Sequence, residues 1–571
     1  MPPARTPPAA FPIRPSRLEP ILTGLCLALI AGLFALWLPN YLRWPLFLDA
    51  EHFALLAREW DAGVARPYRD SFCYNLPGHI YLFWAGGKLF GWGKPLAVLL
   101  PDVILLVSFC GWTLAWSRRC FGKLLPGALA LLGLLSFYFN SDFRFTAERT
   151  WHSALLAASA IMVCQAVPGL RGGAFSGLLM GLALLVRPDI AVWGSGALVI
   201  LVTRAFRSGS ERPFRQATRS VLSWSFAAGL VLALGMVPLL AGGLLPDFLR
   251  SFRVALAGGV YDADVARTHT TWGILGNVPY YDCLKPYHFA FFLLGMPGLW
   301  AAALWRGRND VRANLGVWVW CSVAFAVVAL NVPFYIGYLI QPVFFAAFLS
   351  LAPTIAALSD DLRRGPGLGL AVAVLLGLFL VPGLPTYCVP KLARETYSAV
   401  LSGRRVEAAP SFFPYAIAED QRQRQWADFG RCVTYLRHEL PRGHAVMNAI
   451  DPFGDFGGLG MVYASKRRMG GGSNELILPS LPDPIFERFL NASEREPRAA
   501  VLIDAAQVAT HGEGAVLPPE KLNRWKTRIV RMIHDHYQLK ARFGEIEVWV
   551  RTPGTGPEPM QISAKPGAVN R

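Results

Sequence analysis

Long apolar segments alternate with short polar ones over roughly the first two thirds of the chain. A helix needs about 20 apolar residues, with a few either way, to cross a bilayer. By that measure the pattern predicts about eleven membrane-spanning helices. Their ranges are 21–38, 95–116, 124–139, 151–167, 174–186, 190–206, 221–240, 288–305, 315–330, 335–358 and 368–381.

One apolar stretch decides the orientation of all later helices. Residues 78–91, GHIYLFWAGGKLFG, are interrupted by Gly86 and Gly87 and carry Lys88. Counting them as a span would place the basic cluster 204–219 outside, against the excess of Lys and Arg in cytoplasmic loops. We therefore expect this stretch at the outer interface, within a long first external loop (39–94). The N-terminus is then cytoplasmic.

Beyond residue 387 the composition becomes that of a water-soluble segment. Amphipathic helices are predicted at 431–440 and 519–537, and strands at 444–450, 498–505 and 545–551. The predicted fold class is an α-helical polytopic membrane protein with a C-terminal extracytoplasmic α/β domain. Its predicted parts are a disordered cytoplasmic tail (1–20), a membrane module (21–387), the α/β domain (388–553) and a disordered tail (554–571).

Composition agrees with a membrane protein. The chain is 53% hydrophobic and 16% charged, with a mean hydropathy of +0.36, which excludes an ordinary soluble protein. Its net charge of +17 comes from basic clusters between apolar runs, as in a positive-inside bias, so we expect no nucleic-acid partner. The nine cysteines show no metal-ligand spacing.

Candidate chemistry begins directly behind the first predicted span. The stretch FLDAEHFALLARE places Asp49, Glu51 and His52 near the outer membrane surface. A carboxylate at the centre of a span costs about 2.5–3.5 kcal/mol, so acids at membrane depth tend to be functional. The alternative is that Asp49 caps an interfacial helix beginning at Glu51.

Residues 48–91, LDAEHFALLAREWDAGVARPYRDSFCYNLPGHIYLFWAGGKLFG, resemble the first external loop of the GT-C superfamily of glycosyltransferases, which use polyprenyl-phosphate sugars. The likeness is to the branch with protein O-mannosyltransferases, the aminoarabinose transferase of lipid A and lipopolysaccharide-core transferases. It extends to the C-terminal pattern YQLKARFGEIEVWVR (537–551).

The resemblance implies an inverting glycosyltransferase without a cofactor or a metal. Asp49 would be the general base, the donor a polyprenyl-phosphate-linked sugar in membrane lipid, and the acceptor a glycan, lipid or protein. Relatives often carry a lysine before the proline at Pro77, where this chain has YNLP, so Arg69 and Arg149 are the preferred phosphate ligands. The expected substrate-binding residues are Glu51, Arg69, Asn75, His79, Glu148, Arg149 and His152.

Other readings of these residues stay open. Each arginine has the alternative of a salt-bridged interfacial residue, and Asp142, Arg187, Asp262, Asp264, Arg267 and His269 are further candidates on external segments. A transporter or flippase of a lipid-linked saccharide is the alternative function, and a non-catalytic glycan-binding protein a third. The location expected is the bacterial cytoplasmic (inner) membrane, multi-pass, with the C-terminal domain periplasmic or extracellular.

Overall fold

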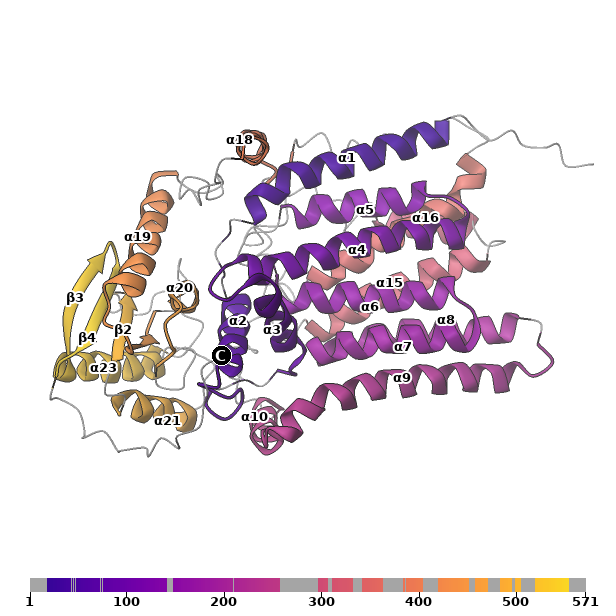
Figure 1. The fold of residues 1–571 in the computed structure, drawn as a ribbon. Coiled ribbons are helices and arrows are strands. Elements are labelled where there is room, and N and C mark those ends of the chain that lie inside the picture. The colour runs from indigo at the N-terminus through magenta and orange to yellow at the C-terminus, as the bar shows by residue number, and fades with distance from the viewer. Residues whose placement is uncertain are drawn as a thin grey trace, which may run out of the picture.

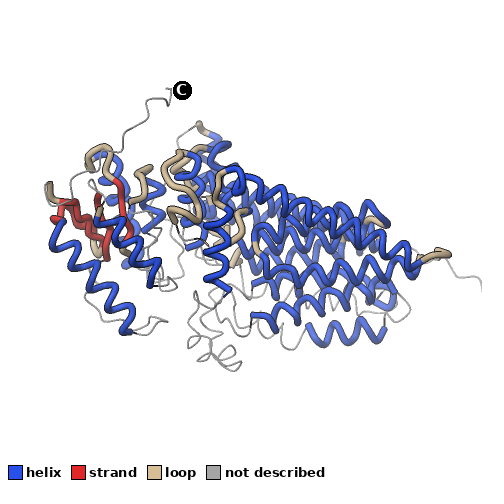
Figure 2. The backbone as a smooth tube through the Cα atoms, turned by 90° about the horizontal axis from the view of Figure 1, so that it is seen from below, coloured by secondary structure: helices blue, strands red, loops and turns tan. Residues whose placement is uncertain are grey.

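The chain consists of a helical bundle followed by a small sheet domain that lies beyond one end of the bundle (Figures 1 and 2). The computed structural model describes residues 18–553 except 43, 45, 47, 72, 74, 141–146, 209, 257–295, 307–310, 332–340, 363–383, 386, 404–418, 451–457, 471–482, 496–498 and 505–518.

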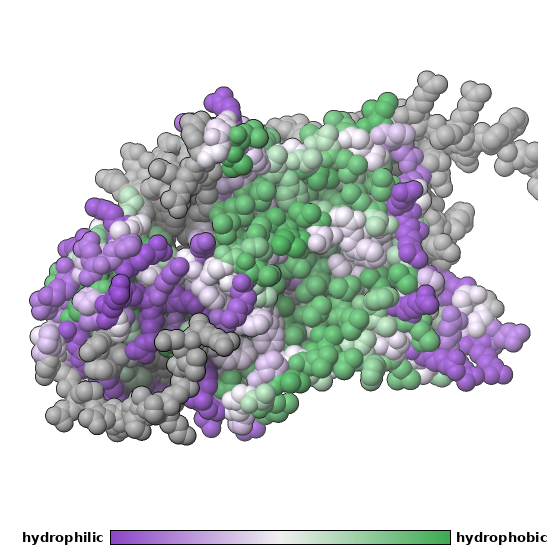
Figure 3. Space-filling model, in the orientation of Figure 1, coloured by the Kyte–Doolittle hydropathy of each residue, from purple (hydrophilic) through white to green (hydrophobic). Residues whose placement is uncertain are grey.

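The bundle is built from the apolar segments that the sequence analysis identified. Among the described residues, five helices are long and apolar enough to cross a membrane. Apolar side chains cover the flank of the bundle between two polar ends (Figure 3). The bundle helices are α1 (Leu18–Tyr41), α4 (Leu96–Phe121), α5 (Leu125–Tyr138), α6 (Arg149–Ala166), α7 (Gly169–Val186), α8 (Ala191–Arg207), α9 (Pro213–Ala241), α14 (Met296–Arg306), α15 (Val311–Asn331) and α16 (Gln341–Leu362).

These helices agree with the prediction of a helical, multi-pass protein, while the number of about eleven spans stays a prediction. The predicted span 368–381 and the first part of 288–305 lie outside the described residues. So do residues 1–17 and 554–571 of the two predicted tails. Helix α1 begins at Leu18, three residues before the predicted span.

Small residues let neighbouring helices approach closely. Gly173, Gly177 and Gly181 lie one turn apart along α7 and face α9. A Cβ atom on Gly173 would lie 2.6 Å from the carbonyl oxygen of Ser220 on α9. Close backbone approach of this kind is how helices pack in lipid, where there is little hydrophobic driving force between them.

Two short helices cover the end of the bundle nearer the sheet domain. They are α2 (Leu48–Asp61) and α3 (Gly78–Phe90). Helix α3, with 13 residues, is too short to span a bilayer, and the interfacial position of 78–91 stays a prediction. Because α2 begins at Leu48, Asp49 lies inside its first turn and does not cap a helix that begins at Glu51. The 3-10 turn η2 (Pro188–Ile190) joins α7 to α8 at the same end.

The C-terminal domain holds a four-stranded mixed sheet of order β1-β2-β4-β3. Strands β1 (Ala445–Asn448) and β2 (Ala499–Asp504) are parallel, and β4 (Ile546–Arg551) is antiparallel to both β2 and β3 (Tyr537–Phe543). The predicted strands are confirmed, whereas β3 was not predicted. The helices of this domain are α19 (Glu419–His438), α20 (Gly458–Ser465), α21 (Asp483–Glu494) and α23 (Pro519–His536).

One helix within the range assigned to the soluble domain lies on the bundle instead. Helix α18 (Pro390–Leu401) packs along α1, and the hydroxyl of Tyr397 donates a 2.9 Å hydrogen bond to the carbonyl oxygen of Ala35. Leu392 and Ala393 on this helix are buried. The sheet domain itself therefore follows α18.

Helix α2 connects the two parts of the molecule. Most of its apolar side chains, including Phe53 and Ala57, belong to the core of the bundle, whereas Leu55 belongs to the core of the sheet domain. Arg58, 7% exposed, donates hydrogen bonds to the carbonyl oxygens of Val462 (3.2 Å) and Tyr463 (2.9 Å) in the last turn of α20. A cation at a helix C-terminus satisfies carbonyls that lack partners within the helix.

Candidate functional site

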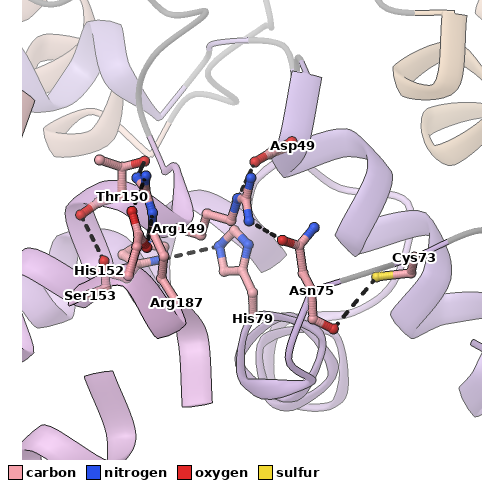
Figure 4. A network of polar contacts seen from close by, with 10 residues as sticks. Asp49, Cys73, Asn75, His79, Arg149, Thr150, His152, Ser153 and Arg187 are labelled. Atoms are coloured by element: carbon pink, nitrogen blue, oxygen red, sulfur yellow. Dashed lines mark hydrogen bonds and ion pairs between the residues drawn. The ribbon is translucent and has the colours of Figure 1, made fainter. Parts of the chain in front are cut away.

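Asp49, Asn75 and Arg149 meet at the sheet-domain end of the bundle (Figure 4). The Nε atom of Arg149 donates a 2.6 Å hydrogen bond to Oδ2 of Asp49, and Nη1 of Arg149 donates to Oδ1 of Asn75. The Asp49 side chain is 27% exposed and that of Arg149 only 8%. The expected base and one of the two preferred phosphate ligands are thus in direct contact.

The local backbone around this trio is constrained. The hydroxyl of Tyr68 donates a 2.8 Å hydrogen bond to the carbonyl oxygen of Asn75, which fixes the loop that precedes α3. Tyr68 itself has a φ of 68°, and Ala147, two residues before Arg149, has a φ of 53°. Residues other than glycine rarely adopt such values, and they concentrate at functional sites where the surrounding structure imposes them.

Glu148 adds a second carboxyl group beside Asp49. It lies at the N-terminus of α6 and is 1% exposed. Burial raises the pKa of Glu148 well above its usual value, and the nearby Asp49 carboxylate raises it further. A protonated Glu148 would leave Asp49 as the negative charge that faces Arg149. Glu51, in the first turn of α2, is also buried.

His79 and His152 lead from this trio into the bundle. Nε2 of His79 lies 3.1 Å from Nδ1 of His152, and Nε2 of His152 lies 2.9 Å from Oδ1 of Asp102. The hydroxyl groups of Tyr41 (2.5 Å) and Tyr138 (2.6 Å) donate to Oδ2 of the same carboxylate. All five side chains are buried, so the carboxylate is stabilised by three donors in place of water.

In this row of hydrogen-bonded side chains, the protonation of each residue determines whether its neighbour donates or accepts. If Asp102 is ionised it can only accept, so His152 carries a proton on Nε2. With a neutral His152 ring, Nδ1 accepts and His79 donates from Nε2. Burial lowers the pKa of His79 well below its usual value, and the charge of Arg149 also lowers it, so the His79 ring is neutral at physiological pH.

Asp102 was missed by the sequence analysis, which counted it within an apolar span. An ionisable residue inside a predicted span is a signal of its own, because such residues face the protein interior and find partners there. Its partners could not be read from the sequence, since His152 is 50 residues away along the chain.

The other expected site residues are placed as follows. Arg69 donates from Nε to Oδ2 of Asp247 on α10 (Leu245–Leu256) at 2.7 Å, and from Nη2 to the carbonyl oxygen of Gly243 at 2.6 Å. The carboxylate partner of Arg69 is thus Asp247, whereas that of Arg149 is Asp49. Asp142, Asp262, Asp264, Arg267 and His269 lie outside the described residues.

Two further ionisable residues flank the site. Arg187 pairs with Asp189 through Nε (2.6 Å) and donates from Nη1 to the hydroxyl of Thr150 (2.6 Å). Burial lowers the pKa of His52 to about 4, an effect that Asp49 partly opposes. In the described ranges, no three His, Cys, Asp or Glu side chains are grouped as a metal ion requires.

Comparisons with known proteins identify the fold. Neither a protein-family model nor a curated protein matches the sequence. Solved structures do: ArnT from Cupriavidus metallidurans bound to undecaprenyl phosphate has a TM-score of 0.54 and 14% identity, over 94% of this chain and 99% of that one. ArnT in the apo state gives 0.51 with the same identity and coverage. An Archaeoglobus fulgidus oligosaccharyltransferase tethered to an acceptor peptide gives 0.45 at 12% identity, over 95% of this chain and 75% of that one.

ArnT is an aminoarabinose transferase of the GT-C superfamily. At 14% identity the likeness concerns the fold, and it covers nearly the whole of both chains. The expectation drawn from the first external loop is thus confirmed at the level of structure: this chain has the GT-C fold.

Proposed function

We propose that this chain is a membrane glycosyltransferase that moves a sugar from a polyprenyl-phosphate donor to an acceptor hydroxyl group, with Asp49 as general base. The observation that carries the proposal is the contact between Asp49 and Arg149 at one end of the bundle. It brings a proton acceptor and a phosphate-binding group within one site. ArnT, whose fold this chain shares, was solved with undecaprenyl phosphate bound.

The proposed reaction is a single inverting displacement. An oxygen of Asp49 takes the proton of the acceptor hydroxyl group while the hydroxyl oxygen attacks the anomeric carbon of the sugar. The bond from that carbon to the phosphate oxygen breaks, and the electron pair leaves with the polyprenyl phosphate. The leaving group departs as an anion, so the reaction needs no general acid but gains from a cation beside the phosphate.

Arg149 suits the second role. A guanidinium group has five N–H donors in a planar fork that matches the oxygens of a phosphate group. With Nε on Asp49, the same group could hold the phosphate on one side and the base on the other. Asn75 and Glu148 border this position, and His79 and His152 support it from inside the bundle.

The proposed orientation places this site outside the cytoplasm. The end of the bundle opposite Asp49 carries Arg118, Arg119, Arg204 and Arg207 in the last turns of α4 and α8, and a basic excess of that kind is typical of cytoplasmic ends. The sheet domain would then be periplasmic in a bacterial inner membrane. Its position beside α2 places it next to the path by which a glycan, lipid or protein acceptor would reach Asp49.

A flippase or transporter of a lipid-linked saccharide has one observation in its favour. Asp102 and His152 are ionisable residues buried inside the bundle, as transporters often show. That arrangement is equally compatible with a rigid support for the site at Asp49. The distinction is chemical, because a transporter moves its substrate without breaking the bond to phosphate.

The test is to incubate the purified chain with a panel of polyprenyl-phosphate sugars and an acceptor mixture, and to measure release of free polyprenyl phosphate. Wild type should release it from one donor, and Asp49→Asn should lose at least about a hundredfold in rate, in line with removal of a catalytic base. Asp61→Asn, on the same helix, is the matched control. Undiminished turnover in Asp49→Asn would refute the proposed role, and movement of intact donor across vesicles without release would favour the flippase.

A further inference from the structure

A cavity of about 540 Å³ lies at the end of the bundle opposite Asp49. It is formed where the C-terminal ends of α4, α6 and α8 meet the N-terminal ends of α7 and α9. Its volume falls within the range of sites that bind small molecules or lipid headgroups. Nothing in the proposed transfer reaction uses it.

The cavity has a strongly cationic lining. Arg119, Arg204 and Arg207 line it, and none of the lining residues that the structure describes is acidic. In the part of the chain that the structure describes, neither Arg119 nor Arg207 forms an ion pair. At the other end of the bundle Arg69, Arg149 and Arg187 each pair with a carboxylate. Among the described residues, arginines at the Asp49 end of the bundle thus have carboxylate partners, whereas Arg119 and Arg207 at this cavity do not.

Arg204 is held in position before any ligand arrives. Its Nη1 atom donates to the carbonyl oxygens of Cys164 (2.6 Å) and Gln165 (2.8 Å) at the end of α6. The oxygen of the Gln165 side chain accepts from Nε1 of Trp116 at 2.9 Å. The Gln165 amide therefore keeps its NH₂ group as a hydrogen-bond donor beside the cavity.

Two helix N-termini also border the cavity, beside the C-terminal ends of α4, α6 and α8, which carry partial negative charge. Gly169 opens α7 and lines the cavity, and Gln216 lies in the first turn of α9. Helix N-termini present N–H groups without partners in the helix and carry partial positive charge. The three arginines therefore carry the preference for an anionic group such as a phosphate over a neutral ligand.

The rest of the lining is apolar. Phe121, Val167, Ile200, Leu201 and Leu315 form the wall beside the arginines. A free inorganic anion would gain nothing from that wall, whereas an amphiphile would bury part of a chain against it. We propose that this cavity binds the phosphate-ester headgroup of an anionic lipid from the leaflet facing away from Asp49.

This binding site is independent of the transferase reaction, and its test uses lipid binding as the readout. The full chain is purified in detergent and titrated with dioleoylphosphatidylglycerol or dioleoylphosphatidylcholine, and bound lipid is counted by native mass spectrometry. Wild type should retain one phosphatidylglycerol when phosphatidylcholine has been lost. Arg119→Gln/Arg207→Gln should weaken that binding by about tenfold or more, because two charged donors to phosphate are removed.

Arg118→Gln is the matched control, since Arg118 is an exposed neighbour that does not line the cavity. It should change lipid retention by less than about twofold. Melting curves of all variants show whether each is folded. The proposal is overturned if the double variant retains phosphatidylglycerol as wild type does, or if phosphatidylcholine is retained equally.

Inorganic phosphate, added as a competitor, distinguishes the possible sources of the phosphate group. Retention of phosphatidylglycerol in its presence supports a lipid site in which the apolar wall contributes to binding. Displacement of the lipid at equal concentrations of phosphate would overturn the lipid assignment and identify a site for a free phosphate compound. In that case Arg119→Gln/Arg207→Gln should also abolish the effect of inorganic phosphate.

Discussion

Arg149 donates a 2.6 Å hydrogen bond to Asp49 although the two residues lie 100 positions apart in the chain. One stands at the start of α6 and the other in the first turn of α2, so the pair joins a bundle helix to a helix that covers the end of the bundle. An ion pair that is only partly exposed keeps much of its strength, because water and salt screen it less than they screen a surface pair. It also ties the proposed base to the proposed phosphate ligand.

Substitutions of Arg149 should lower activity with the polyprenyl-phosphate donor. Arg149→Lys keeps the charge but loses the planar fork, so we expect about a tenfold loss in kcat/KM for the polyprenyl-phosphate sugar. Arg149→Ala should lose about a hundredfold or more, as when a donor that stabilises a leaving anion is removed. Steady-state kinetics measure both. Equal activity of Lys, Ala and wild type would exclude a role in phosphate binding.

Asp102 should matter for stability because it accepts three hydrogen bonds out of contact with water. In Asp102→Asn one oxygen becomes an NH₂ group, which cannot accept from His152 or from the tyrosine hydroxyl groups. We expect a loss of about 2–3 kcal/mol in the free energy of unfolding. Tyr41→Phe, which removes one donor of the three, should cost about 1 kcal/mol. Thermal unfolding in detergent tests the order, and Asp102→Asn no less stable than Tyr41→Phe would contradict it.

Glu148 should make stability depend on pH. Its pKa in the folded protein is raised above the usual value of 4.5, so the folded state binds the proton more tightly than the unfolded state. This contribution is fully present below pH 4.5 and is lost as pH rises through the folded pKa. Glu148→Gln removes the titration, so its melting temperature should fall less than that of wild type between pH 5 and pH 8. Parallel curves for the two proteins would contradict the prediction.

Arg58 should hold the sheet domain against the helix that carries Asp49. Its guanidinium group bonds to the end of α20 and pairs with Glu59 at 2.6 Å, and both side chains are buried. Arg58→Ala leaves Glu59 as a buried charge without this partner, so we expect a loss of about 3–5 kcal/mol. The double substitution Arg58→Ala/Glu59→Ala should cost less than the sum of the single ones. Limited proteolysis of Arg58→Ala should release the sheet domain first. If the losses of the two single substitutions simply add in the double variant, Arg58 and Glu59 are not coupled.

The orientation has a direct test. A reporter enzyme that is active only outside the cytoplasm, fused after Val400 in α18, should be active, whereas one fused in the polar segment between α8 and α9, after Ser210, should be inactive. The reverse result would place Asp49 on the cytoplasmic side and remove the basis for a donor at the outer leaflet.

The sequence by itself determined the elements. A run of apolar residues is a local property, so the bundle helices and three of the four strands could be read from it. Strand β3 was not predicted although its sequence YQLKARF alternates apolar and polar residues, because the segment was used only for the family resemblance of residues 537–551. The resemblance of residues 48–91 to GT-C enzymes predicted the fold, and the GT-C fold is confirmed.

Only the tertiary structure decided which polar groups meet. Asp49, Glu148 and Arg149 were expected at one site and do lie together, but Arg69, an equal candidate in the sequence, pairs with Asp247. Asp102 forms its hydrogen bonds with residues on other helices. The physical reason is that burial is encoded position by position, whereas a hydrogen bond between distant residues depends on how whole helices pack. No local sequence pattern identifies the partner of a buried charged residue.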